Sequence, residues 1–397
     1  MNNRLDNASL LSPSSSAEPC RRAAPYPLVL PQIDGAAARR RSYGEAQNSA
    51  TRSLAWAVAI ERVEKELEDW VAAGQGNELR KEAADRILTC FREKGTALDL
   101  GFLRLKTLPH CIGKLPALQS LDVSFNALTM LPYPIGDLLL LQSLVASGND
   151  LAELPDRIGD LLSLHTLDLS DNLLTELPGS IGELFLLHTL DVSGNKLVAL
   201  PGRIGEMSSL RTLVLSGNHL KELPGSIGAL AELQYLDASD NALMGLPGAI
   251  GNLSSLHILD LSKNHLRELF GDIGGLASLQ YLDVSDNTLT ELPDGIAQWS
   301  SLQILDLSYN KFTELSDAIS TLSSLQLLRL RGNPLMFLPE SLRNLHAFQA
   351  FASNHDYLDL PSTSLNRSCL PALLRPFSRS TSESSLGLVK SVAASNR

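Results

Sequence analysis

The sequence has few of the features that mark secreted, membrane-bound or catalytic proteins. Its four cysteines are scattered rather than paired in clusters, which indicates a reducing working environment: Cys20, Cys90, Cys111 and Cys369. The first thirty residues hold no apolar run of the length that a secretory signal peptide needs. No stretch is long enough to span a bilayer, so we expect a soluble protein.

An excess of positive charge and recognisable catalytic motifs are missing as well. The chain carries 33 Lys and Arg against 44 Asp and Glu, and this net charge of −11 argues against a general nucleic-acid binder. We find no phosphate-binding glycine loop, no cluster of metal ligands and no nucleophile motif. The sequence therefore predicts a protein that is not an enzyme and needs no cofactor or metal.

Asparagine recurs at a fixed interval of 23 residues through most of the chain: Asn126, Asn149, Asn172, Asn195, Asn218, Asn241, Asn264, Asn287, Asn310 and Asn333. They lie in the frame L-x-x-L-x-L-x-x-N-x-L, with Val or Ala for the third leucine in some copies, and Leu164 to Leu174 is one full copy. This period and frame are the signature of a leucine-rich repeat. We expect the leucines to share one interior and the asparagine amide to satisfy backbone groups where each strand ends. The predicted fold is an α/β right-handed solenoid, or horseshoe, with a concave parallel β-sheet.

The second half of each repeat follows the template L-P-x-x-I-G-x-L, as in Leu177 to Leu184. Proline cannot donate a ladder hydrogen bond and so helps to turn the chain out of the strand. Glycine is expected to let the backbone bend at the corner. The template decays towards the end, where proline is replaced by Phe270 and Ser316 and glycine by Ala297 and Ser320. We predict about eleven repeats over residues 96–361, the last one degenerate from residue 340 onwards.

Three other segments flank the repeats. Residues 1–51 are rich in Ser, Ala, Pro and Arg and are predicted to be disordered, with a possible secretion signal. Residues 52–95 are predicted to form a helical hairpin that caps the open end of the solenoid, because apolar residues fall on one helix face at Trp56, Ile60, Val63, Leu67 and Trp70. Residues 362–397 are Ser-rich and weakly basic, and we expect disorder there too.

The outward positions of the strands define the candidate site. The position before each L-x-L is small and polar in the first repeats and large and apolar in the later ones: Ser120, Ser143, Thr166, Thr189, Thr212, Tyr235, Ile258, Tyr281, Ile304 and Leu327. Two residues further on the column is mostly acidic: Asp122, Val145, Asp168, Asp191, Val214, Asp237, Asp260, Asp283, Asp306 and Arg329. Adjacent strands lie about 4.8 Å apart, so each column should form a continuous stripe.

We hypothesise that a partner protein lies in the concavity on the later half of both columns. The predicted contact residues are Tyr235, Ile258, Tyr281, Ile304, Leu327, Asp237, Asp260, Asp283, Asp306 and Arg329, and the aspartates favour a basic partner. A structural interpretation stands beside this one, because aspartate is ordinary in L-D-L-S repeats and apolar residues are common at the other position. His165 and His188 occupy equivalent positions in adjacent repeats, but without a third ligand they are read as surface histidines.

The lead-in to the repeats resembles a known family. Trp70, Arg80, Ala83, Arg86, Ile87 and Cys90, followed by Leu98-x-Leu100-x-x-Leu103-x-Leu105-x-x-Leu108-Pro109, are similar to the helical lead-in and first repeat of leucine-rich-repeat effectors. Bacterial type III secretion systems, especially those of plant-associated bacteria, inject these proteins into host cells. The resemblance covers about residues 52–340 and implies an effector that binds a host or cellular protein in the host cytoplasm.

The resemblance leaves two alternatives. Many members carry a C-terminal ubiquitin-ligase or Fic-type transferase domain, whereas this chain shows neither a Cys-x-Asp nor a His-Pro-Phe motif after its repeats. It would then be the substrate-recognition part of a ligase effector whose catalytic domain is encoded elsewhere. The L-P-x-x-I-G-x-L template is equally similar to plant intracellular repeat proteins of the Ras-binding group, which implies a cytoplasmic signalling scaffold.

Overall fold

The computed structural model describes residues 35–269, 273–336 and 338–344, with side chains described from Leu54 to Leu342. The chain divides into two compact units, Met1–Ala57 and Val58–Arg397. In the first unit only helical backbone is described, whereas the second contains the remaining elements. Among the described residues, none of the helices combines the length and apolar character that crossing a membrane requires.

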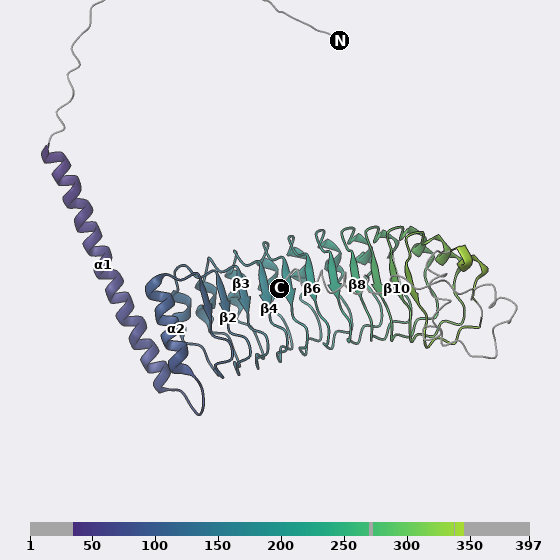
Figure 1. Cartoon of the computed structure of the whole chain (residues 1–397), viewed down its shortest axis with the longest axis horizontal. Helices are drawn as coiled ribbons and strands as arrows, with labels where there is room; N and C mark the ends of the chain where they lie inside the picture. The colour runs from purple at the N-terminus through teal and green to yellow at the C-terminus, as the bar shows by residue number, and fades with distance from the viewer. Residues whose placement is uncertain (1–34, 270–272, 337, 345–397) are drawn as a thin grey trace, which may run out of the picture. The chain divides into compact units, whose positions relative to one another are not determined.

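Two α-helices precede a regular alternation of short strands and 3-10 turns (Figure 1). The helices are α1 (Gly35–Ala72) and α2 (Arg80–Glu93). The strands are β1 (Ala97–Asp99), β2 (Ser120–Asp122), β3 (Ser143–Val145), β4 (Thr166–Asp168), β5 (Thr189–Asp191), β6 (Thr212–Val214), β7 (Tyr235–Asp237), β8 (Ile258–Asp260), β9 (Tyr281–Asp283), β10 (Ile304–Asp306) and β11 (Leu327–Arg329). The turns are η1 (His110–Lys114), η2 (Tyr133–Asp137), η3 (Asp156–Asp160), η4 (Gly179–Glu183), η5 (Gly202–Glu206), η6 (Gly225–Ala229), η7 (Gly248–Asn252), η8 (Ile273–Gly275), η9 (Asp294–Gln298), η10 (Asp317–Thr321) and η11 (Glu340–Asn344).

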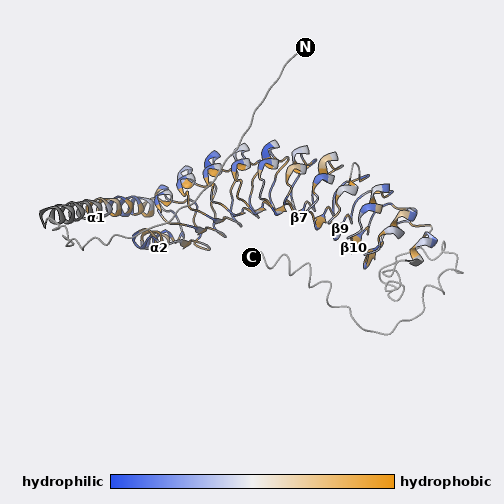
Figure 2. Ribbon diagram, turned by 90° about the horizontal axis from the view of Figure 1, so that it is seen from above, coloured by the Kyte–Doolittle hydropathy of each residue, from blue (hydrophilic) through white to orange (hydrophobic). Residues whose placement is uncertain are grey.

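The strands form one parallel sheet in strict sequence order, β1 to β11. Each strand pairs with the next so that residues 23 positions apart are partners, for example Tyr235 with Ile258. Within this unit the strands line the inner side of a curved stack and the 3-10 turns line the outer side (Figure 2). The frame leucines are buried in between, most of them completely. The predicted leucine-rich repeat solenoid with a concave parallel sheet is therefore confirmed.

The repeated asparagines bond to backbone groups at the ends of the strands, as the frame predicted, and they also link successive coils. The Nδ2 of Asn172 donates to the carbonyl oxygens of Leu169 at 2.9 Å and Ser170 at 3.1 Å in its own coil. It also donates to Ala146 of the preceding coil at 3.0 Å, and its Oδ1 accepts from the amide of Leu151 at 3.1 Å. One buried side-chain amide thus bonds to four backbone groups. Replacing the asparagine by an apolar residue would leave these buried groups without that hydrogen-bond partner.

The glycine of the I-G pair has a different role from the one expected. We expected it to permit a bend, but positive φ occurs instead after the strands, at Gly148, Gly194 and Gly217. At Gly182 an added Cβ would lie only 2.5 Å from the carbonyl oxygen of Arg203 in the next coil. Glycine is needed there because the 3-10 turns of adjacent coils approach closely.

The helical cap is confirmed, and one arginine ties both helices to the first coil. The Arg80 side chain is 9 % exposed and pairs with Glu78 at 2.9 Å. Its guanidinium donates to the Trp70 carbonyl at 2.7 Å and to the Thr107 hydroxyl at 3.1 Å, and it lies 4.9 Å from the centre of the Trp70 ring. At the edge strand, Arg86 donates to the carbonyl of Asp99 at 2.9 Å, which satisfies part of the open sheet edge.

The predicted start of the cap is wrong. Helix α1 begins at Gly35, so residues 35–51, which were expected to be disordered, are helical. The composition of residues 1–51 misled this prediction because its five prolines all precede residue 32, whereas the stretch from Gly35 is rich in alanine and arginine, which favour helix. Residues 1–34, Phe270, residues 345–361 of the predicted degenerate repeat and the tail 362–397 lie outside the described residues.

We predict that Gly182→Ala destabilises the repeat domain by about 1–3 kcal/mol, because the new methyl group would overlap backbone of the next coil. Gly179→Ala in the same turn is the matched control, since an added Cβ there meets nothing within 4 Å. Urea unfolding followed by circular dichroism measures both variants. Equal unfolding midpoints for the two would contradict this role of the glycine.

Candidate protein-binding surface

The strand register places the two predicted columns side by side on the inner face of the sheet. The first column runs without a gap from Ser120 on β2 to Leu327 on β11, and the second from Asp122 to Arg329. Side chains alternate across a strand, so the leucine between the two columns points into the core while both columns face the concavity. We call these two columns together the concave wall.

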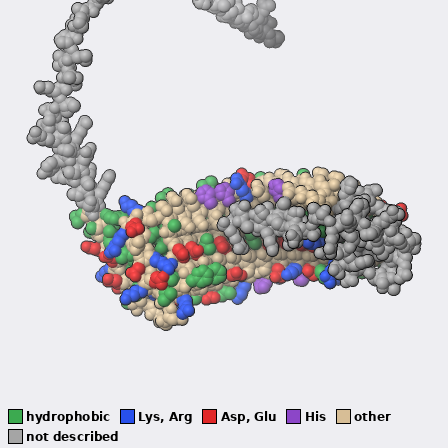
Figure 3. Space-filling view, in the orientation of Figure 1, with side chains coloured by type: hydrophobic (Ala, Val, Ile, Leu, Met, Phe, Trp, Pro, Cys, Tyr) green, Lys and Arg blue, Asp and Glu red, His purple; other side chains and the backbone are tan. Residues whose placement is uncertain are grey.

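The later half of the concave wall carries two distinct stripes. The apolar stripe consists of Tyr235, Ile258, Tyr281, Ile304 and Leu327, all of them half-buried. The aspartate stripe consists of Asp237, Asp260, Asp283 and Asp306 on β7 to β10. Figure 3 shows acidic and apolar side chains next to one another over the first coils of this unit. The structure therefore brings the predicted site residues together, whereas their role in binding stays a prediction.

The aspartates also have a local structural task. The Oδ1 of Asp237 accepts hydrogen bonds from the Ser239 amide at 3.0 Å and the Ser239 hydroxyl at 2.7 Å. The same bond to the amide two residues on recurs at Asp260 and Asp283, at 2.9 Å in both cases. This turn fixes the chain where it leaves the strand. The structural interpretation accounts for one carboxylate oxygen per residue and leaves the second facing the concavity.

The second oxygens differ along the aspartate stripe. At Asp283 the Oδ2 accepts the hydroxyl of Tyr281 at 3.1 Å, and at Asp306 it pairs with the Arg329 guanidinium at 3.0 Å. Among the residues that the structure describes, no lysine or arginine forms an ion pair with Asp237, Asp260 or Asp283. Arg329 therefore neutralises the carboxylate at the β10 end of the aspartate stripe. The three adjacent carboxylates of Asp237, Asp260 and Asp283 have no such cation in the described part of the chain.

Burial and mutual repulsion raise the pKa values of these carboxyl groups. Desolvation by burial is the main cause at Asp260, and the neighbouring charge of Asp283 adds to it, so that its pKa rises to about 6. The pKa of Asp283 is also raised, first by burial and then by the charge of Asp306. Burial together with the nearby aspartates raises the pKa of Tyr235 and Tyr281, which keeps both phenols neutral. A cation laid along this row would relieve the repulsion.

The two histidines are stacked and not arranged as a metal site. The rings of His165 and His188 lie 5.1 Å apart between centroids, and both side chains are half-buried at the start of β4 and β5. Burial and the positive charge of Arg211 lower the pKa of His188. The described part of the chain contains no group of three or more potential metal ligands.

Sequence reasoning missed an aromatic pair at the first coils. Phe102 and Phe125 are 69 % and 53 % exposed, and their rings stack at a centroid distance of 4.7 Å. Both have positive φ in the turn after the strand, a conformation that bulky residues rarely adopt. The signal was present one residue before the asparagine, where most repeats carry glycine or aspartate.

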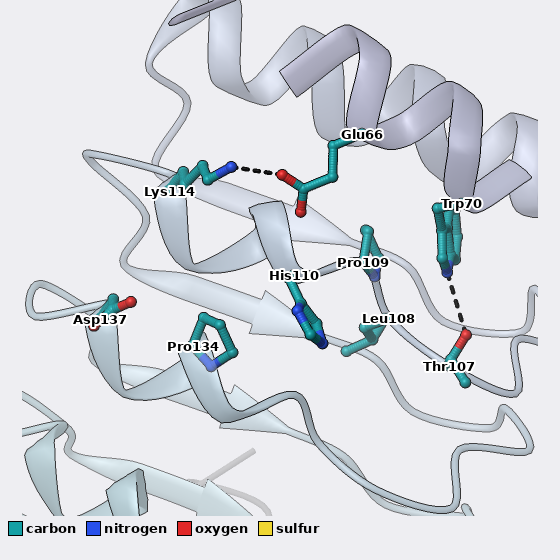
Figure 4. A pocket seen from close by; sticks show the side chains of 9 residues that line it. All are labelled: Glu66, Trp70, Thr107, Leu108, Pro109, His110, Lys114, Pro134 and Asp137. Carbon is teal, nitrogen blue, oxygen red and sulfur yellow. Dashed lines mark hydrogen bonds and ion pairs between the residues drawn. The ribbon is translucent and has the colours of Figure 1, made fainter. Parts of the chain in front are cut away.

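A cleft of about 740 Å³ lies where the cap meets the first coils (Figure 4). It is lined by Glu66, Trp70, Thr107, Leu108, Pro109, His110, Lys114, Pro134 and Asp137. Lys114 pairs with Glu66 at 2.5 Å on its rim, and the Trp70 indole donates to Thr107 at 3.2 Å. These contacts hold the cap in place, and the cleft has no cluster of reactive groups.

Comparisons with known proteins agree with this architecture. A family model described as a leucine-rich repeat region matches residues 134–215 and 179–268, and a leucine rich repeat model matches residues 278–335. A leucine-rich repeat protein of Leptospira interrogans is 34 % identical, with a TM-score of 0.54, over 65 % of this chain and 72 % of that one. The chain is a leucine-rich repeat protein. No curated protein matches its sequence.

Two other solved structures show the range of proteins that this leucine-rich repeat protein is similar to. YopM, a leucine-rich effector protein from Yersinia pestis, is 28 % identical with a TM-score of 0.57, over 72 % of this chain and 80 % of that chain. The ectodomain of the plant membrane receptor kinase GASSHO1/SCHENGEN3 from Arabidopsis thaliana, in complex with CASPARIAN STRIP INTEGRITY FACTOR 2, is 31 % identical with a TM-score of 0.52. That match covers 61 % of this chain and only 33 % of the receptor chain.

We predict that Asp260→Asn increases the stability of the repeat domain at pH 7 and not at pH 4. The pKa of Asp260 is about 6 in the folded protein, above the value of about 3.9 in an unfolded chain. Stability is therefore lost as the pH rises through this window, because the folded state resists losing the proton. Asparagine cannot ionise, so the variant should gain on the order of 1–3 kcal/mol at neutral pH.

Urea midpoints of both proteins, measured from pH 4 to pH 7, test this. Asp168→Asn is the control, since it keeps the corresponding turn at Ser170 but has Val145 on one neighbouring strand. A difference between Asp260→Asn and the parent protein that is constant across the window would show that the raised pKa of Asp260 is not its cause.

Proposed function

We propose that this leucine-rich repeat protein is a non-enzymatic scaffold whose concave wall binds a partner protein. The observation that carries the proposal is the pairing of the apolar stripe with the aspartate stripe on four adjacent strands, β7 to β10. Tyrosine and aliphatic side chains beside charge are typical of binding hot spots. The leucine-rich repeat fold supports protein–protein interaction, and similar structures such as the receptor ectodomain with its factor are complexes.

The chemistry of the wall selects a basic partner with apolar anchors. Tyr235 and Tyr281 offer rings at low cost in conformational entropy, and their hydroxyls lie near carboxylates. Three aspartates without a cation repel one another and attract lysine or arginine. Asp306 is already neutralised by Arg329, so the partner's cations belong over Asp237, Asp260 and Asp283.

The binding proposal predicts that Tyr235→Ala with Tyr281→Ala weakens capture of basic, apolar peptides at least about thirtyfold, since two hot-spot losses of at least ~1 kcal/mol multiply. Peptides selected from a random display library on the purified parent protein serve as the probe, and fluorescence anisotropy measures their Kd. Ser143→Ala with Thr189→Ala changes the same column in the other half and is the matched control. Unchanged affinity in a folded double tyrosine variant would remove the concave wall as the site.

We further propose that the chain acts as a type III effector inside a host cell. Similarity to the effector YopM supports this proposal, as does the Ser-rich sequence of residues 1–51. A cytoplasmic signalling scaffold and the recognition part of a ligase effector are the competing assignments.

A reporter enzyme fused to residues 1–60 should enter host cells from a bacterium with an intact type III system, and stay behind when that system is deleted. A fusion to residues 61–120 is the control and should not be exported. Retention of the first fusion in an export-competent bacterium would favour the cytoplasmic scaffold.

A further inference from the structure

The half of the concave wall with the two stripes has a definite length and chemistry. From β7 to β10 it spans three strand spacings, about 14 Å. Along this distance it presents two tyrosines, two isoleucines and the carboxylates of the aspartate stripe. An occupant that crosses the strands must therefore offer apolar side chains and cations within about four or five extended residues, at about 3.4 Å per residue.

The chain itself contains a segment of this composition. Residues 370–379 read Leu-Pro-Ala-Leu-Leu-Arg-Pro-Phe-Ser-Arg, the most apolar stretch of the tail. In an extended chain Leu373, Arg375, Phe377 and Arg379 fall on one face, because side chains alternate. The two arginines would then be separated by about 14 Å. The three carboxylates that lack a cation among the described residues extend over two strand spacings, about 10 Å, which the long arginine side chains can bridge. The two prolines favour extended backbone.

Charge complementarity supports the match. Residues 362–397 carry five basic side chains and one acidic side chain, Glu383, although the whole chain is strongly acidic. The aspartate stripe offers Asp237, Asp260 and Asp283 without a cation among the described residues. Two guanidinium groups over this row would form charge-assisted hydrogen bonds to the free carboxylate oxygens.

The tether is long enough to let the segment reach the wall. The described solenoid ends at Asn344 in η11, about 26 residues before Leu370. The predicted degenerate repeat ends at residue 361, nine residues before Leu370, and nine extended residues reach about 30 Å. The wall from β11 back to β7 is four strand spacings, about 19 Å. A tether that can span this distance makes the contact intramolecular, so weak affinity is enough for occupancy.

We propose that residues 370–379 occupy the concave wall over β7 to β10 as an intramolecular ligand, which an external partner must displace. This proposal rests on the proposed function of the wall and names its regulation. The partner it selects is a protein segment with the same alternation of apolar and basic side chains but higher affinity. The tail then prevents weak basic ligands from binding and sets a threshold for the true partner.

Site-specific cross-linking in the full chain tests the proposal directly. A photo-reactive benzoylphenylalanine at position 377 should cross-link within one chain to peptides that contain β7 to β10, as mapped by mass spectrometry. The same residue at Leu388 is the control and should not label this surface selectively. Cross-links to another surface, to a second copy of the chain or to nothing would each overturn the proposal.

A competition measurement gives an independent readout. A labelled peptide of residues 366–381 should bind Arg375→Glu with Arg379→Glu at least tenfold more tightly than it binds the parent chain, since the altered tail no longer competes. Equal affinity for both proteins would overturn the intramolecular contact. Asp237→Asn with Asp283→Asn, introduced into the chain with the two Arg→Glu substitutions, should weaken binding of the labelled peptide at least tenfold. Asp122→Asn with Asp168→Asn in the same chain is the control and should leave the affinity unchanged.

The two proposals fail in different ways. If tyrosine substitution abolishes binding of library peptides while position 377 does not label the wall, the wall binds partners and the tail does not regulate it. If position 377 labels the wall but tyrosine substitution leaves library peptides bound, the tail contact stands and partner binding belongs to another surface.

Discussion

The side-chain amide of the repeated asparagine is the interaction on which the rest of the structure depends. At Asn172 it donates to carbonyls in its own coil and the preceding one, and it accepts from a backbone amide of the preceding coil. The amide offers two N–H donors and an acceptor oxygen on one short side chain without carrying charge. Because the same bonds recur at every coil, they set the strand register and thereby align both columns of the concave wall.

This register has an electrostatic consequence. Aspartate at the end of a strand is useful locally, since Asp237 fixes the turn through Ser239. Strict repetition then places one carboxylate beside the next at strand spacing, where burial and like charge raise the pKa of Asp260 to about 6. Aspartate, which stabilises each turn locally, thus produces a continuous region of negative charge along the concave wall.

Periodicity explains how much the sequence could predict. Each repeat samples the same environment, so the frame gave the fold, the strand register and the members of the apolar and aspartate stripes. The hydrogen bonds around Arg80 in the cap and the early start of α1 each occur only once, so no repetition in the sequence indicates them. The close approach at Gly182 was also missed, because it depends on the distance between coils and not on local sequence. The Phe102–Phe125 stack likewise becomes visible only when adjacent coils are placed together.

The two halves of the concave wall share one backbone arrangement and differ in the chemistry of their side chains. The first half carries Ser and Thr, whose small side chains offer little apolar area to a partner. The second half combines rings, aliphatic groups and carboxylates, and its far end is closed by the Arg329–Asp306 pair. In that pair the Arg329 guanidinium neutralises the Asp306 carboxylate, so among the described residues the uncompensated negative charge of the aspartate stripe lies on β7, β8 and β9. The two stripes therefore differ in extent, because the apolar stripe continues over β10 and β11.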